Sequence, residues 1–303
     1  MASIQNYVFQ RFLHLGIKIA QNKIKGRENV SVEETRKGLE KLFSVSKIPK
    51  GVKFQKIQID GLPAEWITPK NLKNTGVVLY LHGGGYMLGS ISTHSPLMAR
   101  IALASKTKVL AIEYGLAPER PYPCALEDSL KAYHWLIAQG YDPKKIVIAG
   151  DSSGGGLAVA TLLKLKDNNE SQPAACACLS PWLDLQVSGE TIVTHANKDL
   201  LVNSIGLQIA AYSYAQEEQL THPYISPLYA DLKGLSPMYI QVSGSEVLLD
   251  DTVRFEKKAK ESGVEIEVHI WKNMLHVWQA FGFLPEAAKA IKDIGRYIEK
   301  KTK

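Results

Sequence analysis

The chain has 303 residues, 45% of them hydrophobic, and a formal net charge of +6 at pH 7. This length suits one large domain or two small ones, and the apolar share is ample for a packed core. The positive charge comes largely from scattered lysines near the two ends, so the composition excludes a nucleic-acid-binding footprint. Cys124, Cys176 and Cys178 leave one cysteine unpaired in any disulfide scheme and contain no C-x-x-C pair. That favours a reducing cytoplasm and gives no metal site.

The N-terminal stretch 4–24 has apolar residues at helical spacing, with Arg11 and Lys18 between them. These charges interrupt the apolar run, so we expect neither a secretory signal peptide nor a membrane-spanning helix. A basic amphipathic helix packs over its own protein core more often than it lies on a membrane surface. We therefore expect packing on the core and no stable membrane insertion.

The next elements read as a hairpin followed by strands and helices in alternation. Residues 52–59 alternate between apolar and polar, Asp60 and Gly61 predict a turn, and residues 64–68 return as the second strand. Buried strands are predicted at 77–81, 108–113, 145–149, 174–179, 238–243 and 265–271. Helices are predicted at 96–105, 126–139, 155–166, 251–262 and 285–300. This order implies an α/β fold with a mostly parallel central sheet flanked by helices, and the helical interval 187–229 is an insertion above the sheet.

Residues 150–154 read Gly-Asp-Ser-Ser-Gly and fit the pattern G-x-S-x-G, with Ser152 in the serine position. A predicted strand precedes the motif and a predicted helix follows it, which is the context that a nucleophilic serine requires. The turn must be tight, so small neighbours are needed, and the helix start favours negative charge on an attacked carbonyl. The motif alone is about as consistent with a glycine-rich turn that has no chemistry.

The loops after the parallel strands meet at one edge of the sheet, so the rest of a site is sought there. The loop after strand 77–81 reads His-Gly-Gly-Gly-Tyr over residues 82–86, and its backbone N–H groups suit an oxyanion site. It lacks the spacing of a phosphate-binding or dinucleotide-binding loop.

Two further loops supply an acid and a base. Glu246, Asp250 and Asp251 follow strand 238–243, and each could orient a histidine; helix capping accounts for the two aspartates without catalysis. His276 follows the last predicted strand. The chain order serine, acid, histidine is the one expected of an α/β-hydrolase.

The motifs HGGG at 82–85, GDSSGG at 150–155 and MLHVW at 274–278 resemble those of the α/β-hydrolase esterases of the hormone-sensitive lipase-like family. The resemblance continues through residues 114–119, 123–128 and 179–184. It implies backbone oxyanion donors at Gly84, Gly85 and Ser153, with Glu246 as the triad acid where the family usually has aspartate. Ser153 replaces the alanine of many relatives, which leaves the backbone donor intact.

The resemblance implies a serine carboxylesterase with the triad Ser152, Glu246 and His276, acting on short- to medium-chain esters through an acyl-enzyme, with no metal or cofactor. It also implies one domain over 1–303, capped by residues 1–50 and 187–225, with Tyr86 and Met87 beneath an apolar acyl pocket. Hydrolysis of lactones or amides by the same triad stays open. The plant gibberellin receptors share the glycine loop and the serine but lack the triad histidine, so His276 argues against a receptor. The partner is a small-molecule ester, and a homodimer is left open.

Overall fold

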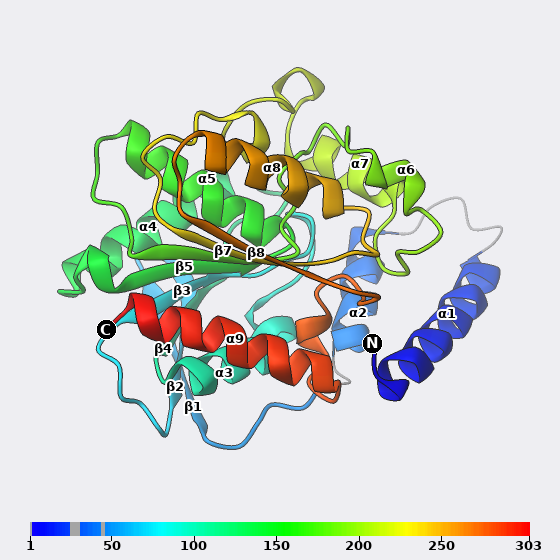
Figure 1. Ribbon diagram of the computed structural model, residues 1–303, viewed down its shortest axis with the longest axis horizontal. Coiled ribbons are helices and arrows are strands. Elements are labelled where there is room, and N and C mark those ends of the chain that lie inside the picture. The colour runs from blue at the N-terminus through cyan, green and yellow to red at the C-terminus, as the bar shows by residue number, and fades with distance from the viewer. Residues whose placement is uncertain (1, 25–30, 44–45) are drawn as a thin grey trace.

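The structure is a computed structural model that describes residues 2–24, 31–43 and 46–303. In these residues one sheet has the strand order β1-β2-β4-β3-β5-β6-β7-β8 (Figure 1). Its strands are β1 Val52–Ile59, β2 Leu62–Pro69, β3 Val77–Leu81, β4 Lys108–Ile112, β5 Ile146–Asp151, β6 Ala175–Leu179, β7 Met238–Ser243 and β8 Ile266–Trp271. The pairs β1–β2 and β2–β4 are antiparallel and the other neighbours are parallel. The predicted mostly parallel sheet is confirmed.

The hairpin of β1 and β2 closes through the predicted two-residue turn. Ile59 pairs with Leu62, and Asp60 and Gly61 between them have φ values of 47° and 83°. Aspartate and glycine tolerate this left-handed conformation, which a two-residue hairpin turn requires. The second strand begins at Leu62, two residues before the predicted position, because pairing continues up to the turn.

Helices cover both faces of the sheet (Figure 1). Helices α3 (Ile91–Ser105) and α9 (Pro285–Lys301) pack on one face, where Met98 and Ile294 share a core cluster with Val78 and Val147. Helices α4 (Cys124–Ala138), α5 (Ser153–Asp167) and α8 (Leu249–Glu261) cover the opposite face. A parallel sheet buried on both sides needs continuous apolar strands, and all five residues of β3 are buried.

Helix α3 begins five residues before the predicted start at residue 96. Ser90 caps it, because the Ser90 hydroxyl accepts a hydrogen bond from the Thr93 amide, and the Thr93 hydroxyl accepts one from the Ser90 amide. This reciprocal capping box fixes the helix start, and Pro96 lies inside the helix. The predicted start at residue 96 is therefore wrong by five residues, although proline is common in a first helical turn.

Among the described residues, four helices lie outside the sheet layers: α1 (Ile4–Ile24), α2 (Val32–Phe43), α6 (Thr191–Thr194) and α7 (Ser204–Tyr214). Short 3-10 turns complete the described elements, at Pro143–Lys145, Glu217–Gln219, Pro227–Tyr229 and Trp278–Ala280. The predicted N-terminal helix is confirmed with its predicted bounds, whereas α2 was not predicted as a separate element. In the described part of the chain, no helix has both the length and the hydropathy needed to cross a bilayer.

Candidate active site

Ser152 lies between β5 and α5 in a conformation that few residues adopt. Its φ of 52° and ψ of −123° lie outside the regions that L-residues commonly occupy, so the turn that carries the side chain is strained. A Cβ atom at Gly150 would collide with the carbonyl of Gly154, and one at Gly154 would collide with the carbonyl of Leu81. The two glycines of the motif are therefore required by close backbone approach as well as by the turn.

His276 and Glu246 complete a line of hydrogen bonds that begins at Ser152. His276 Nε2 lies 2.9 Å from Ser152 Oγ, and His276 Nδ1 lies 2.7 Å from Glu246 Oε2. An ionised carboxylate only accepts, so Nδ1 carries the proton and Nε2 of the neutral ring accepts from the serine hydroxyl. Burial acts to lower the pKa of His276, but the Glu246 carboxylate outweighs it and raises that pKa above its usual value.

Hydrogen bonds hold the Glu246 carboxylate at the oxygen that faces away from His276. Glu246 is fully buried, and its Oε1 accepts hydrogen bonds from the Ser180 hydroxyl at 2.7 Å and the Ser243 amide at 2.9 Å. Burial raises the pKa of Glu246, although the His276 contact opposes the increase. Two bonds to one oxygen leave the other oxygen directed at the imidazole.

The two aspartates that competed for the acid role contact other groups. Asp250 Oδ2 accepts from the Glu190 amide at 3.0 Å, and Asp251 Oδ2 accepts from the amides of Leu183 and Asp184. Both lie in the first turn of α8, but neither is its N-cap, which is Leu248. The capping explanation for these residues is therefore wrong; they tie α8 to the loops after β6.

The glycine loop lies against the serine turn. Gly84 and Gly85 have φ values of 124° and 63°, and a Cβ at Gly84 would collide with the Leu88 carbonyl. The Tyr86 amide donates to Ser153 Oγ at 3.2 Å, which ties the loop to the start of α5. Ser153 is the first residue of α5, so its own N–H belongs to the helix end that has no intrahelical acceptor.

A buried ion pair lies beneath the serine and was missed from the sequence. His94 Nε2 lies 3.2 Å from Asp151 Oδ2, while Asp151 Oδ1 accepts from the Tyr80 hydroxyl and the Gly83 amide. Burial opposes ionisation of Asp151, but the His94 charge outweighs burial and lowers the pKa of the carboxyl. Burial and the His94 charge lower the pKa of neighbouring His82 to about 3, so His82 is neutral. Asp151 therefore joins the glycine loop, through the Gly83 amide, and helix α3, through His94, to the turn that carries Ser152.

A pocket of about 470 Å³ opens beside these residues, within the usual range for small-molecule sites. Gly84, Gly85, Ser152 and His276 line it, together with apolar side chains from other segments: Val32, Met87, Leu88, Trp182, Leu201, Val202, Leu207, Ile209, Ala210 and Val277. Tyr86 does not line it. Its ring lies behind the pocket wall, only 1% exposed and stacked on Tyr214 with centroids 3.8 Å apart.

Two more residues near Glu246 and His276 were not predicted to contribute to the site. Ser180 accepts from the Val277 amide at 3.3 Å while donating to Glu246, so it joins the acid loop to the histidine loop. Asp199 Oδ2 accepts from the Val247 amide, and its Oδ1 accepts from the amides of Leu201 and Val202. Ser180 directly follows β6, and this position at the carboxyl end of a strand could have marked it as a site residue. Asp199 carries no such sequence signal, because it lies in an irregular segment.

Comparison with known proteins is consistent with this geometry. Residues 78–280 match a family model described as alpha/beta hydrolase fold. The chain is 39% identical over 240 residues to an acetyl-hydrolase of Streptomyces hygroscopicus, covering 79% of this chain and 80% of that protein. It is 36% identical over 248 residues to an esterase of Acinetobacter venetianus, covering 81% of this chain and 82% of that protein. The chain belongs to the alpha/beta hydrolases.

Solved structures show to which group of alpha/beta hydrolases this chain belongs. An esterase from the bacterial hormone-sensitive lipase family superposes with a TM-score of 0.92 at 38% identity, covering 100% of both chains. EstE5, in a crystal soaked with p-nitrophenyl butyrate, superposes with a TM-score of 0.92 at 36% identity, covering 99% of both chains. This alpha/beta hydrolase is therefore a member of the bacterial hormone-sensitive lipase-like esterases, which confirms the resemblance inferred from the sequence.

Proposed function

We propose that this chain is a serine carboxylesterase in which Ser152 is the nucleophile, His276 the general base and acid, and Glu246 the residue that orients the imidazole. One observation carries the proposal: an unbroken line of hydrogen bonds runs from Glu246 through His276 to Ser152, which lines an apolar pocket. That arrangement activates a hydroxyl for attack on an acyl carbon. The esterase names of its relatives support the same reaction.

The reaction follows from the chemistry of these groups. Ser152 Oγ attacks the ester carbonyl as His276 Nε2 takes its proton, and the negative oxygen is bound by the N–H groups of Gly84, Gly85 and Ser153. His276 then gives the proton to the departing alkoxide, which leaves an acyl-enzyme. Water repeats the sequence, with His276 as base, and releases the acid. The reaction calls for no metal or cofactor.

The acyl group enters the apolar pocket, which supports esters of short to medium chain length. We assign the cap to residues 1–50 and 187–225, since Val32 from α2 and Leu201, Val202 and Leu207 from the insertion contribute to the pocket wall. Residues 1, 25–30 and 44–45 of this assignment lie outside the described part of the chain. The p-nitrophenyl butyrate soak of EstE5 shows the kind of ester offered to a relative. Three free cysteines support a cytoplasmic location.

The test is hydrolysis of p-nitrophenyl esters of graded acyl length by the purified chain, with a lactone and an anilide as comparators. We expect the highest kcat/KM on short or medium esters and loss of turnover in Ser152→Ala. Ser153→Ala is the matched control, because it removes the neighbouring hydroxyl while keeping the backbone N–H. A fluorophosphonate should label Ser152. Labelling at Ser153, full activity of Ser152→Ala, or turnover of the anilide or lactone alone would contradict the proposal.

A further inference from the structure

Along Ile4–Leu15, the part of helix α1 whose side chains the structure describes, one face contacts the rest of the protein and the opposite face is exposed. On the inner face, Asn6 Nδ2 donates to the Asn273 carbonyl at 2.8 Å, and the Phe9 ring lies 4.9 Å from that of Phe281. Ser3 also donates to the Glu286 carboxylate. These contacts fix the helix against the loop after β8 and the start of α9, so its outer face has a defined direction.

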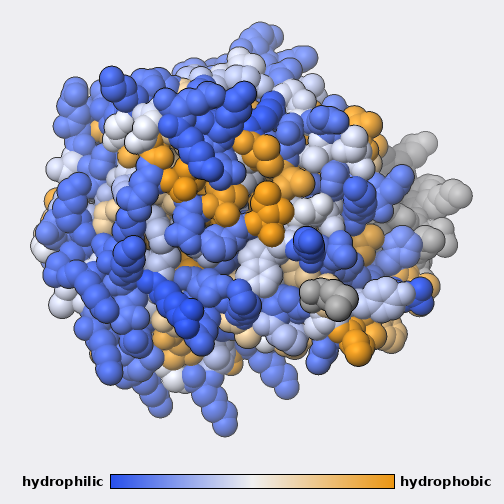
Figure 2. All heavy atoms as spheres, viewed as in Figure 1, coloured by the Kyte–Doolittle hydropathy of each residue, from blue (hydrophilic) through white to orange (hydrophobic). Residues whose placement is uncertain are grey.

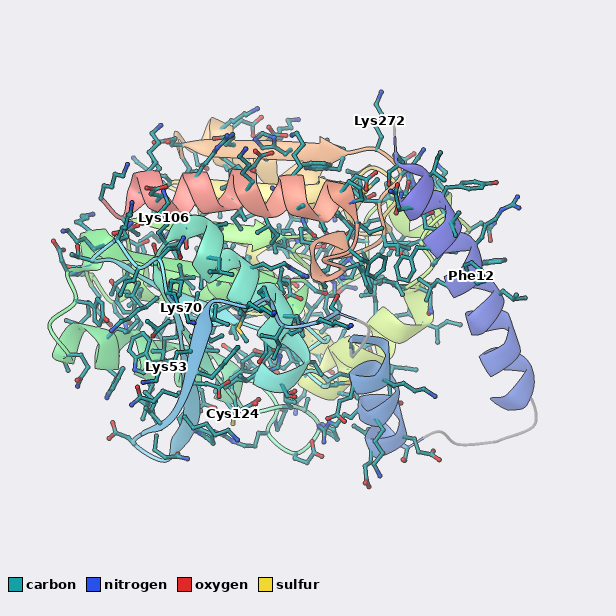
Figure 3. The ribbon with its side chains drawn as sticks, turned by 90° about the horizontal axis from the view of Figure 1, so that it is seen from below. Phe12, Lys53, Lys70, Lys106, Cys124 and Lys272 are labelled. Carbon is teal, nitrogen blue, oxygen red and sulfur yellow. The ribbon has the colours of Figure 1, made fainter. Side chains whose placement is uncertain are left out.

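The outer face of α1 is apolar and exposed, which is unusual for a surface helix. Ile4 is 80% exposed and Phe12 is 70% exposed. Their apolar neighbours on this face are Tyr7, Val8 and Leu15, all exposed. Figure 1 and Figure 3 both show α1 at the margin of the molecule, and Phe12 is labelled on it in Figure 3. The surface in Figure 2 is by contrast mostly hydrophilic, with apolar side chains in a few clusters.

The charge on α1 has one sign. Residues 4–24 contain no aspartate or glutamate, and they contain Arg11, Lys18 and Lys23. Arg11 is exposed among the apolar side chains and lies over the Tyr7 ring, 4.9 Å from its centroid. A helix that exposes apolar and aromatic groups together with cations has the composition of a segment that lies in a membrane interface.

A second copy of the chain fits this face poorly. Over Ile4–Leu15 the face is about 18 Å long and about 10 Å wide, which is roughly a quarter of the 800 Å² per partner that a stable interface needs. Two such faces brought together would also bury Arg11 of each copy in an interface to which residues 4–24 of the other copy bring no carboxylate. A lipid surface has neither problem, because single apolar side chains can insert between its headgroups and its anionic headgroups attract the arginine.

We propose that the outer face of α1 docks on the surface of an anionic phospholipid bilayer. Ile4, Val8, Phe12 and Leu15 enter the boundary between headgroups and acyl chains, and Arg11 binds lipid phosphates. The cytoplasmic leaflet carries the required negative charge. Phe9 and Leu13 pack against the same apolar cluster as Leu201, which lines the pocket. Docking therefore brings the pocket close to esters dissolved in the lipid, and it does not depend on which residues carry out catalysis.

The experiment is sedimentation of the full-length protein with vesicles of phosphatidylcholine alone or mixed with phosphatidylglycerol. The wild type should bind the mixed vesicles, should bind the neutral ones at least tenfold more weakly, and should be released by salt. Phe12→Glu and Arg11→Glu should each lower binding to the mixed vesicles by about tenfold or more. Two variants are used so that the result does not depend on one of them folding.

Val253→Glu on α8 is the matched control, because it adds the same charge at a half-exposed apolar site on another helix. It should bind the mixed vesicles as the wild type does. Absence of binding to the mixed vesicles, equal binding to neutral ones, or wild-type binding by both α1 variants would overturn the proposal. So would a dimer in light scattering that Phe12→Glu dissociates, because the face would then belong to a second copy.

Discussion

Replacing Glu246 by glutamine keeps the size of the side chain and removes its charge, so it tests the proposed triad acid with little change in packing. The orientation of the new amide is determined by the structure. Glu246 Oε1 accepts from Ser180 and Ser243, and a glutamine must keep its oxygen there because the Ser243 amide can only donate. Turning the amide round would leave that buried N–H unsatisfied, which costs about 1–3 kcal/mol.

The glutamine nitrogen therefore faces His276 Nδ1 and donates to it. The imidazole proton then moves to Nε2, which can no longer accept the proton of Ser152. In serine proteases this wrong tautomer costs about 10⁴ in turnover, which corresponds to about 5.5 kcal/mol in the barrier. We expect a loss of that order in kcat for Glu246→Gln, with a melting temperature close to that of the wild type.

The pH profile gives an independent readout of the same variant. If His276 is the general base, kcat/KM should rise as His276 loses its proton, and Glu246 raises the pKa of His276. Without the carboxylate that pKa falls, so the acid limb of the residual activity should move to lower pH. Asp250→Asn and Asp251→Asn are the controls and should keep most of the activity. The reasoning is refuted if Glu246→Gln retains turnover within about tenfold of the wild type, or if Asp250→Asn is the inactive variant.

Three further variants test neighbouring contacts. Ser180→Ala should lower kcat and leave KM nearly unchanged, because it removes a charge-assisted hydrogen bond to Glu246. Ser226→Ala, at an equally buried serine, should affect stability alone, so equal kcat in the two variants would contradict this role of Ser180. Asp199→Asn should move the acid limb to lower pH, because the Asp199 charge helps to raise the pKa of His276, and an unmoved limb with intact folding would contradict it. Burial and the neighbouring carboxylate of Asp184 raise the pKa of Asp251 to about 8, so the folded state binds this proton more tightly than the unfolded state. The free energy of unfolding should therefore decline as the pH rises from about 4 to 8 and should decline less in Asp251→Asn; parallel curves in a pH series of denaturant titrations would contradict this.

The architecture could be predicted because local patterns and chain order carry it. Continuous apolar strands alternating with helices require a parallel sheet with two covered faces, and the Asp60-Gly61 turn identifies the hairpin that extends it. Element ends were less certain, as α3 shows. There the Ser90 cap decided the start, and the rarer case of a proline inside a helix had to be accepted.

The sequence by itself also determined the candidates for catalysis, because a nucleophile turn, a glycine loop and the order serine, acid, histidine are all local or sequential features. Only the tertiary structure decided between Glu246, Asp250 and Asp251 as the carboxylate that faces His276, since a few residues of chain separate them and the fold points them in different directions. The same holds for Ser180 and Asp199, and for the His94–Asp151 pair beneath the serine. Their roles arise from contacts between segments far apart in the chain, and no local pattern encodes such contacts.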